Sequence, residues 1–230
     1  MTTFGIKLVA IGTMVVDHLG IFIWPDCGWL RMVGRLSFPL FAWLIANGVR
    51  HTRNRKSYLL RLLIFAVVSQ LPYVAANRQI QTDFWKLNVL FTLALGLAAI
   101  YLVQKIHTRW GQVMAVAAVG AAAWILRVEY GAYGVLSVLA SYIFFTRWPQ
   151  LVFFQTIIFS APYLLAGALM WSMWGMVEVK VFDFNQLLAP LAFILVYFYS
   201  GKQGTKAKYL FYIFYPLQFV VFYWLKKIGY

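Results

Sequence analysis

The first apolar run of the chain contains two ionisable side chains. The run covers residues 4–24, and Asp17 and His18 lie well inside it. A run of this length is long enough to cross a bilayer, where a charged side chain costs about 2.5–3.5 kcal/mol on insertion scales. Such a group usually persists where it faces the protein interior and contributes to function. Because histidine accepts and returns a proton near neutral pH, the pair predicts acid–base chemistry within the membrane; a hydrogen-bonded structural pair is the alternative.

Lys7 and His18 are expected on the same face of this first helix. They are eleven positions apart, which at about 100° per residue leaves an angular difference of about 20° and an axial separation of about 16 Å. A long anionic cofactor would bridge the two positions. Asp17 points about 100° away from His18, and we expect it to orient a substrate or a partner side chain.

Arg35 is the expected partner of Asp17. It opens the second apolar run at the membrane face near which Asp17 and His18 lie. A partner of opposite charge reduces the cost of burying either group. We therefore predict an Asp17–Arg35 ion pair and assign His18, Asp17 and Arg35 to a catalytic centre. The alternative is an Arg35 side chain that extends to the membrane interface.

A dense basic segment connects the second and third apolar runs. Such side chains next to a helix start bind phosphates through charge and paired hydrogen bonds. Together with Lys7, the residues predicted to bind an anionic cofactor are Arg50, His51, Arg53, Asn54, Arg55 and Arg61. A loop that only sets the orientation of the chain in the membrane has the same composition, so this alternative stays open.

Three polar residues in the later apolar runs are candidates for binding a substrate or stabilising an oxyanion: Asn88, Thr92 and Tyr133. We expect no metal site. The histidines at positions 18, 51 and 107 fall on different runs or different sides of the membrane, and the single cysteine, Cys27, cannot form a cysteine cluster.

The composition predicts an all-α, polytopic membrane helical bundle. Of the 230 residues, 63% are hydrophobic and 11% are charged, against about 45–50% and about 25% in soluble domains. We expect one domain, residues 1–230, with about nine transmembrane helices and a range of eight to ten. The first run shows no cleavage site typical of a signal peptide. The expected spans are 4–24, 32–49, 58–76, 87–104, 111–127, 130–146, 150–170, 186–200 and 207–225.

The charged residues predict the orientation of these spans. With alternating spans and a cytoplasmic N-terminus, the cytoplasmic loops hold only basic residues: Arg50, Arg53, Arg55, Lys56, Arg61, Lys105, Arg109, Arg147, Lys202, Lys206 and Lys208. Apart from Asp17, the acids fall on the opposite side: Asp26, Asp83, Glu129, Glu178 and Asp183. The opposite side also holds basic residues: Arg31, Arg35, Arg78, Lys86, Arg127, Lys180, Lys226 and Lys227. Lysine and arginine bias sets orientation, so an odd number of spans and an outside C-terminus are expected. The net charge of +14 is explained by this bias and by anionic lipid headgroups, and nucleic acid is not an expected partner.

Several short motifs, in order along nearly the whole chain, resemble the TraX family. They are Asp17-His18, Gly34-Arg35-x-x-Phe38-Pro39-x-Phe41, Arg50-His51-Thr52-Arg53-Asn54-Arg55, Asn88-Val89-Leu90-Phe91-Thr92, Tyr133-Gly134 and Phe214-Tyr215-Pro216. The Lys7-x10-His18 spacing is also similar to the Arg-x10-His pattern of membrane acyltransferase family three. Gln218 and Asn47 depart from the family pattern, where relatives often have histidine and an acid respectively.

The resemblance implies a bacterial inner-membrane acetyltransferase. The founding TraX member is associated with acetylation of the N-terminal amine of an F-type pilin, and in acyltransferase family three the histidine is the proposed catalytic residue and the donor is cytoplasmic acyl coenzyme A. Acetyl coenzyme A (acetyl-CoA), with its phosphates on the Arg50–Arg61 segment, is thus the expected donor, and a pilin-like or envelope amine or hydroxyl is the acceptor. An oligomer is possible. The alternatives are a proton-coupled transporter or channel and a non-catalytic pilus or envelope assembly subunit.

Overall fold

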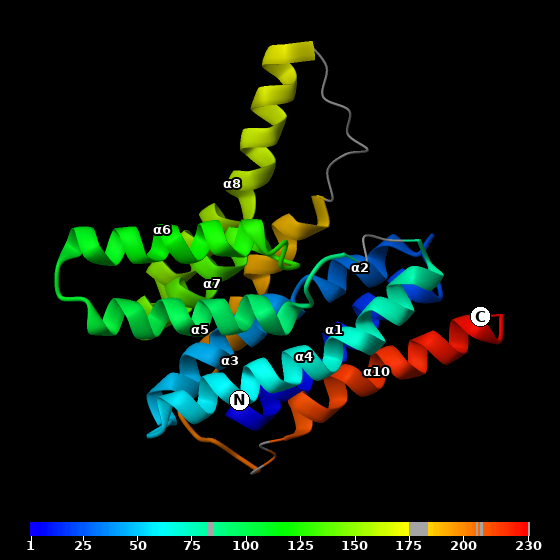
Figure 1. Cartoon of the computed structure of the whole chain (residues 1–230), viewed down its shortest axis with the longest axis horizontal. Helices are drawn as coiled ribbons and strands as arrows, with labels where there is room; N and C mark the ends of the chain where they lie inside the picture. Colours follow the sequence, from blue (N-terminus) through cyan, green and yellow to red (C-terminus); the bar gives the residue numbers. More distant parts are fainter. Residues whose placement is uncertain (82–84, 175–183, 206, 208, 230) are drawn as a thin grey trace.

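The computed structural model describes residues 1–81, 85–174, 184–205, 207 and 209–229. These residues form an all-α structure (Figure 1). Its elements are α1 (Thr3–Phe22), α2 (Gly28–Gly34), α3 (Ser37–His51), α4 (Arg55–Gln79), α5 (Val89–Lys105), α6 (Arg109–Ile125), α7 (Gly131–Ile143), α8 (Trp148–Trp174), the 3-10 helix η2 (Phe184–Leu191), α9 (Ala192–Tyr197) and α10 (Leu210–Lys227).

Polar side chains begin four of these helices. The Thr2 hydroxyl accepts from the Gly5 N–H at the start of α1, and Asn54 caps α4 through the Ser57 N–H. Asn88 and Thr108 cap α5 and α6 in the same way. A side-chain oxygen at this position satisfies a backbone donor that lacks a partner within the helix. These caps fix where the apolar segments become helical.

The second expected span is interrupted where the sequence prediction has one helix. It consists of α2 and α3, and Arg35 and Leu36 lie at the junction. Pro39 therefore occupies the first turn of α3, where its missing N–H costs no hydrogen bond within the helix. Pro39 therefore begins a new helix and does not bend a continuous one.

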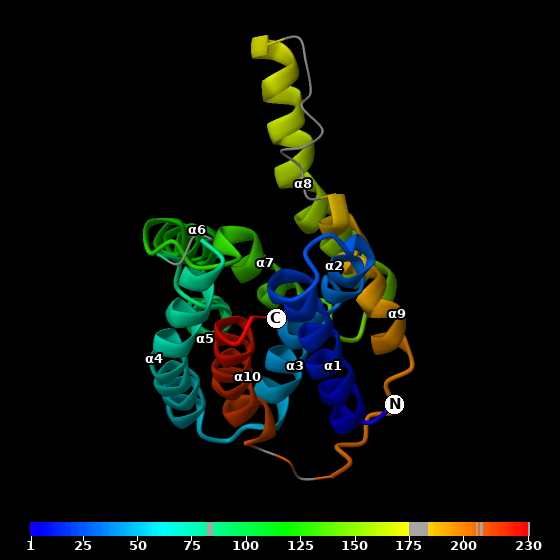
Figure 2. The ribbon, with the colours of Figure 1, turned by 90° about the vertical axis from the view of Figure 1, so that its right-hand side faces the viewer.

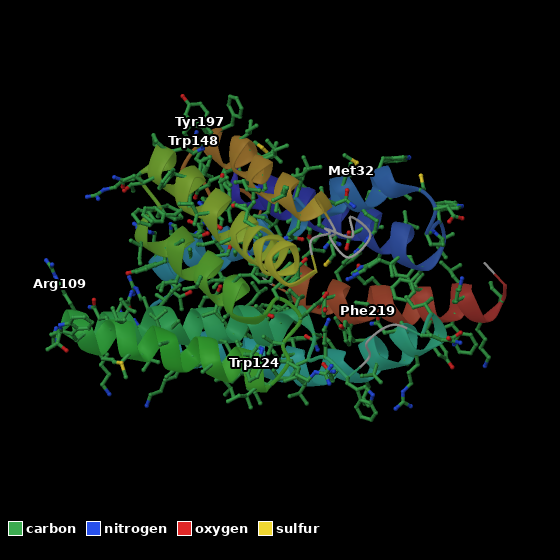
Figure 3. All side chains as sticks on the ribbon, turned by 90° about the horizontal axis from the view of Figure 1, so that it is seen from above. Met32, Arg109, Trp124, Trp148, Tyr197 and Phe219 are labelled. Atoms are coloured by element: carbon green, nitrogen blue, oxygen red, sulfur yellow. The ribbon has the colours of Figure 1, made fainter. Side chains whose placement is uncertain are left out.

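The described part of the chain contains helices of membrane-spanning length. By length and composition, Thr3–Phe22, Gly28–His51 and Arg55–Gln79 can each cross a bilayer, and Val89–Lys105, Gly131–Ile143 and Asn185–Tyr197 are shorter apolar helices. The expected span at 186–200 begins as a 3-10 helix containing Pro190 and is completed by only six α-helical residues. Large apolar side chains lie on the outer surface, among them Met32, Trp124 and Tyr197, whereas Phe219 is buried (Figure 3). Such an exterior is typical of a protein surrounded by lipid.

The helices pack around α1, α3, α4 and α10. Helix α10 lies along α4, α1 packs on α2 and α3, and α5 packs on α4, α6 and α7. The C-terminal part of α8 extends away from this bundle (Figures 1 and 2). The start of α1 is tied to the segment before α10, since the Thr3 and Phe4 N–H groups donate to the carbonyls of Lys202 and Gln203. The N-terminal ends of α1 and α10 are thereby brought together.

Some of the charges used to predict the orientation lie outside the described residues: Asp83, Glu178, Lys180, Asp183, Lys206 and Lys208.

Candidate active site

Asp17 is held by two arginines at the junction of α2 and α3. Arg35 Nη2 donates to Asp17 Oδ1 at 2.7 Å and to Oδ2 at 3.0 Å, and Arg31 Nη1 lies 2.8 Å from Oδ2. The predicted Asp17–Arg35 ion pair is therefore present. Arg35 also donates to the Gln186 Oε1 of η2 at 3.2 Å. Two guanidinium groups offset the charge of this largely buried carboxylate, as the burial of a charge requires.

Gly34 is necessary for this approach. A Cβ atom at position 34 would lie 2.2 Å from Asp17 Oδ1 and 2.3 Å from Asp17 Cβ. The absence of a side chain thus lets α2 pass directly over the carboxylate.

His18 faces a different set of groups. Its side chain is buried, and its Nδ1 lies 3.1 Å from Gln218 Oε1 on α10. In this arrangement Nδ1–H donates to the amide oxygen and Nε2 keeps its lone pair. The imidazole packs on Phe219 at 4.8 Å between ring centroids. Among the described residues Nε2 has no hydrogen-bond partner, so this nitrogen is available as a proton acceptor.

A small cavity of about 30 Å³ joins His18 and Asp17 to residues from α2, α3, α5, α10 and the turn before α7. Its polar lining consists of Asp17, His18, Ser37, Glu129, Tyr130 and Tyr215. The Ser37 hydroxyl donates to the Ala10 carbonyl at 3.0 Å. The cavity has about the volume of one water molecule and brings an imidazole, two carboxyl groups and hydroxyl groups to one point.

Glu129 reaches this cavity through a short backbone bridge. Glu129 N–H donates to the Leu87 carbonyl at 2.9 Å, and Leu87 N–H donates to the Arg127 carbonyl at 3.1 Å. The Glu129 carboxylate and the Tyr215 hydroxyl both lie near the Val89 N–H at the start of α5. Burial, and after it the negative charge of Asp17, raises the pKa of Glu129 to about 7.

A larger cavity of about 400 Å³ lies at the other end of α1. Lys7, His51 and Arg61 supply its cationic or titratable lining, and Thr3, Asn47, Thr52, Tyr58, Gln203, Thr205 and Tyr212 supply polar groups. Its apolar lining comes from Phe4, Phe41, Leu44, Ile45 and Phe211, with Gly48 and Ala207. The volume and the mixed lining are typical of a ligand pocket.

Two buried atoms of residues that line this larger cavity have no hydrogen-bond partner within the described part of the chain. They are the Arg61 Nε donor and the Asn47 Oδ1 acceptor. The other amide atom of Asn47, Nδ2, donates to Thr3 Oγ1 at 3.2 Å. Buried polar atoms usually have partners, so one donor and one acceptor are left for a bound ligand.

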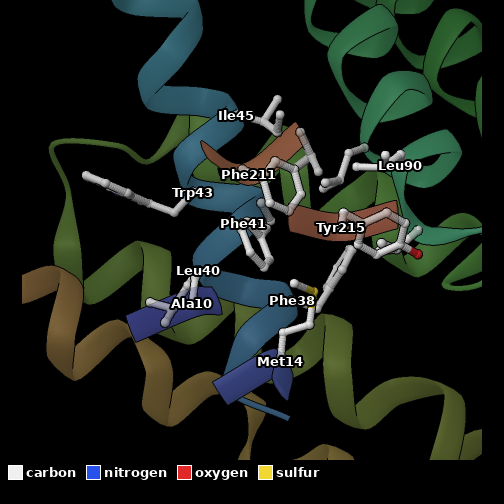
Figure 4. Close-up of a cluster of buried hydrophobic side chains, with 14 of the residues drawn as sticks. Ala10, Met14, Phe38, Leu40, Phe41, Trp43, Ile45, Leu90, Phe211 and Tyr215 are labelled. Atoms are coloured by element: carbon white, nitrogen blue, oxygen red, sulfur yellow. The ribbon is translucent and has the colours of Figure 1, made fainter. Parts of the chain in front are cut away.

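Phe41 lines both cavities. Its ring stacks on Phe211 with 4.2 Å between centroids, and the two rings lie side by side between α3 and α10 (Figure 4). Met14 and Tyr215 lie on the side of Phe41 toward the smaller cavity. The two cavities therefore share an aromatic wall.

The basic segment that the sequence predicts as one phosphate site is divided by the structure. Lys7, His51 and Arg61 line the larger cavity, whereas Arg50, Arg53, Asn54 and Arg55 do not. Arg50 lies over the Phe145 ring at 4.2 Å, and Arg55 lies near the Tyr101 ring. Arg53 is exposed, and Asn54 is the cap of α4. Arg53 and Arg55 are exposed, and they stay close to the larger cavity because they lie in the same short segment as His51 and Arg61.

The predicted oxyanion residues lie beside the smaller cavity but not on its wall. Asn88 is fully buried and uses Nδ2 to donate to Ala66 O and Gln70 Oε1, each at 2.8 Å. Its Oδ1 accepts from the Leu90 N–H. Thr92 accepts from the Tyr130 N–H at 3.4 Å, and Tyr133 packs edge-on against Tyr130 and Phe159. Tyr130 and Tyr215 occupy the cavity wall instead.

A comparison with models of protein families shows to which family the chain belongs. Residues 4–226 match the model described as "TraX protein". The chain belongs to the TraX family. No solved structure matches this TraX family member.

Three curated relatives show how the TraX family similarity is distributed. The chain is 30% identical over 229 residues to a probable fimbrial assembly protein FimC, serogroup H1, of Dichelobacter nodosus, covering 94% of this chain and 92% of that protein. It is 31% identical over 141 residues to Protein TraX of Escherichia coli, covering 60% of this chain and 54% of that protein. Protein TraX of Escherichia coli strain K12 is 33% identical over the same length. The chain thus spans most of the FimC relative but about half the length of the TraX relatives.

Four residues of this site are not assigned to it from the sequence alone, although Gln218 is named there as a departure from the family pattern. Arg31 and Gln186 complete the Asp17 network, Gln218 orients His18, and Glu129 enters the smaller cavity. Glu129 was assigned only a side of the membrane, yet it is an acid next to two tyrosine–glycine pairs, and that pattern was the available signal. Among the residues that the structure describes, no cluster of three or more histidine, cysteine, aspartate or glutamate side chains is arranged to hold a metal.

Proposed function

We propose that this protein is a membrane-embedded acetyltransferase that transfers the acetyl group of cytoplasmic acetyl-CoA to an amine of a pilin-like or envelope protein. The observation that carries the proposal is the pair of cavities along α1. One cavity offers cations and two unpartnered buried atoms, the other offers His18, and Phe41 lines both. Membership of the TraX family and the likeness to a fimbrial assembly protein support the pilus-related acceptor.

In this proposal the larger cavity receives the donor. Lys7 and Arg61 attract the phosphate groups, the unpartnered Asn47 oxygen accepts an N–H from the amide-containing arm, and the aromatic lining contacts the methylene groups. The exposed Arg53 and Arg55 extend the positive potential beyond the cavity. Lys7 and His18 are about 16 Å apart along α1, so an extended arm would bring the thioester to His18 once the Phe41 side chain rotates.

His18 is the proposed general base. Gln218 holds its Nδ1–H, so Nε2 accepts the proton of the attacking amine as the new C–N bond forms and the C–S bond breaks, and it returns that proton to the leaving sulfur. Asp17, fixed by Arg31 and Arg35, positions the acceptor side of the cavity. Tyr130 or Tyr215 donates a hydrogen bond to the developing oxyanion, a role for which Asn88 has no donor left.

The membrane arrangement proposed with this function has nine spans, a cytoplasmic N-terminus and a periplasmic C-terminus in a bacterial inner membrane. It places the larger cavity at the cytoplasmic face, where acetyl-CoA is made, and the smaller cavity toward the outer half of the bilayer. The all-basic loops at the cavity end that holds Lys7, His51 and Arg61 support this orientation.

Calorimetric titration of acetyl-CoA into the purified protein in detergent tests the proposal. We expect saturable binding to the wild type, binding weakened about tenfold or more in Arg61→Ala, and binding within about twofold of wild type in Arg78→Ala. Arg78 is the matched control because it lies at the opposite end of the same helix, α4. His18→Gln should keep binding and lose acetyl transfer by about a hundredfold or more. Folded wild-type protein that binds no acetyl-CoA would refute the enzyme, and proton-flux measurements on the transporter alternative would follow.

A further inference from the structure

Acetylation of an amine at neutral pH requires two proton transfers from the acceptor nitrogen. The acceptor enters as an ammonium ion, which must lose one proton before its lone pair can attack and a second proton as the amide forms. His18 has one free lone pair, on Nε2, because its Nδ1–H donates to Gln218. This imidazole can accept one of the two protons, so the site needs another acceptor for the first.

Of the two carboxyl groups in the smaller cavity, Asp17 is the less suitable. Two guanidinium groups lie within 2.8 Å of its oxygens, so its charge is already paired and its oxygens are already occupied by hydrogen bonds. Glu129 differs in its neighbours. Within the described part of the chain no arginine or lysine lies at ion-pair distance from Glu129, although Arg35 and Lys86 are near enough to favour its ionised form. Its carboxylate is thus able to attract a cation and to accept a proton.

The backbone fixes Glu129 in this position. The Leu87–Val128 bridge joins the start of α5 to the turn before α7, and Arg127 takes a φ of 51° within that turn. This conformation is uncommon for a residue with a side chain. The turn directs the carboxylate into the same cavity as His18 and Tyr130, so an acceptor nitrogen in the cavity would contact both groups.

We infer that Glu129 is a catalytic residue that binds the ammonium group of the acceptor and takes its first proton; this rests on the acetyl transfer proposed above. The ammonium ion and the Glu129 carboxylate become a neutral amine and a carboxylic acid. The amine attacks the thioester carbon, the C–N bond forms and the C–S bond breaks. His18 takes the second proton from nitrogen and gives it to the sulfur, and Glu129 releases the first proton to solvent. The sum is one amide, one free thiol and one proton.

The raised pKa of Glu129, about 7, suits this role. A proton acceptor is most effective when its pKa lies near the working pH, because it is then ionised before the transfer and holds the proton afterwards. The groups that face Glu129 are Asp17, Arg35, Lys86, Tyr130 and Tyr215.

Two membrane-soluble amines test the inference. Octylamine is protonated at pH 7 and 4-butylaniline is neutral, and both are offered with labelled acetyl-CoA to the full-length protein in lipid nanodiscs. We expect Glu129→Gln to lower kcat/KM for octylamine at pH 7 by about a hundredfold and to leave 4-butylaniline within about threefold of wild type. For the variant, octylamine turnover should rise about tenfold per pH unit as the amine itself deprotonates, and Glu129→Asp should restore part of the wild-type rate.

Each result separates the inference from its alternatives. If Glu129→Gln folds and loses activity equally toward both amines, or keeps full activity toward both, Glu129 does not take the proton of the acceptor and the inference is wrong. If the variant does not fold, the wild-type pH profile decides: kcat/KM for octylamine should level off near pH 7, and a steady rise through pH 9 would refute the assigned role. If the wild-type protein acetylates neither amine, the acetyl transfer itself is wrong and the role of Glu129 falls with it.

Discussion

At the residue scale, Asp17 and His18 are adjacent in sequence but bind different partners. Helical geometry predicts that they diverge by about 100°, and Arg35 is a predictable partner because a buried carboxylate needs a cation. The Arg31 contact was not predictable, since it depends on where α2 ends. Gln218 is 200 residues away from His18, and no local pattern in a single sequence connects two residues at that separation. Local periodicity therefore predicts which face a side chain occupies, but not its long-range partner.

The two arginines on Asp17 should differ in their contribution to stability. Arg35→Ala removes a guanidinium whose side chain is 10% exposed, and Arg31→Ala removes one that is 25% exposed. We expect a loss of about 3 kcal/mol for Arg35→Ala and about 1 kcal/mol for Arg31→Ala, because solvent screens the second pair more strongly. Reversible unfolding in mixed detergent micelles measures both values. Equal losses would mean that Asp17 does not distinguish the two partners.

Glu129 should make the stability of the protein pH-dependent in a defined direction. Its pKa is about 7 in the folded protein and 4.5 as a model value for the unfolded chain. Between these values the folded state holds a proton that the unfolded state has released, so stability falls as the pH rises through this window. The Tm of wild type minus that of Glu129→Gln should therefore be more negative at pH 8 than at pH 5. The difference isolates Glu129 because Asp17 and His18 are present in both proteins, and an unchanged difference would contradict the raised pKa.

At the element scale, the sequence predicts the positions of helices well and their interruptions poorly. The expected 4–24 and 58–76 segments correspond to Thr3–Phe22 and Arg55–Gln79, since long apolar runs and a capping threonine or asparagine mark their limits. The break at Arg35 and Leu36 could not be predicted from local sequence, because neither residue is a glycine or a proline. It follows from the tertiary contacts of Arg35 with Asp17 and Gln186, which a single-helix interpretation of residues 32–49 cannot include.

Two asparagine caps provide a matched test of how burial increases the contribution of a helix cap to the free energy of unfolding. Asn54 begins α4 in an exposed position, and Asn88 begins α5 with no exposed surface. We expect Asn54→Ala to cost about 1 kcal/mol. Asn88→Ala should cost about 3 kcal/mol, because it also removes the buried hydrogen bonds that Asn88 Nδ2 donates to Gln70 Oε1 and to the Ala66 carbonyl. Unfolding in mixed micelles measures both. If Asn88→Ala keeps wild-type stability but loses acetyl transfer, the oxyanion role predicted from the sequence would be favoured over the structural one.

At the scale of the whole molecule, composition predicts an all-α protein with apolar helices, and the described residues agree with it. The sequence also predicts the ends of α1 as two separate functional regions, because Lys7 and His18 share a helix face. It does not predict that Gln203, Thr205, Ala207, Phe211 and Tyr212 line the larger cavity, since hydrogen bonds between chain positions about 200 residues apart bring these residues to the start of α1.

The proposed orientation can be measured with the single cysteine. Cys27 lies between α1 and α2 and is partly exposed. In intact cells whose outer membrane is permeabilised, a membrane-impermeant maleimide should label Cys27 from the periplasm. A cysteine introduced by Arg53→Cys in a Cys27→Ser background should be labelled only after the inner membrane is opened. The reverse pattern would invert the topology and place the larger cavity on the wrong side for cytoplasmic acetyl-CoA.

The Phe41 ring has a consequence for the energy supply of the cell. A bacterial inner membrane stores a voltage, and each elementary charge that leaks across it dissipates about 2.3 kcal/mol per 100 mV. A wide aqueous passage from the larger cavity to His18 would let protons leak across the membrane and dissipate this voltage, because the imidazole and Glu129 could pass protons along it. Phe41 is 3% exposed and lines both cavities, so in the proposed function its ring keeps the passage to His18 closed to water and ions except when the donor arm enters. If the proposed acetyl transfer takes place here, the protein can remain in the membrane between turnovers without dissipating the membrane potential.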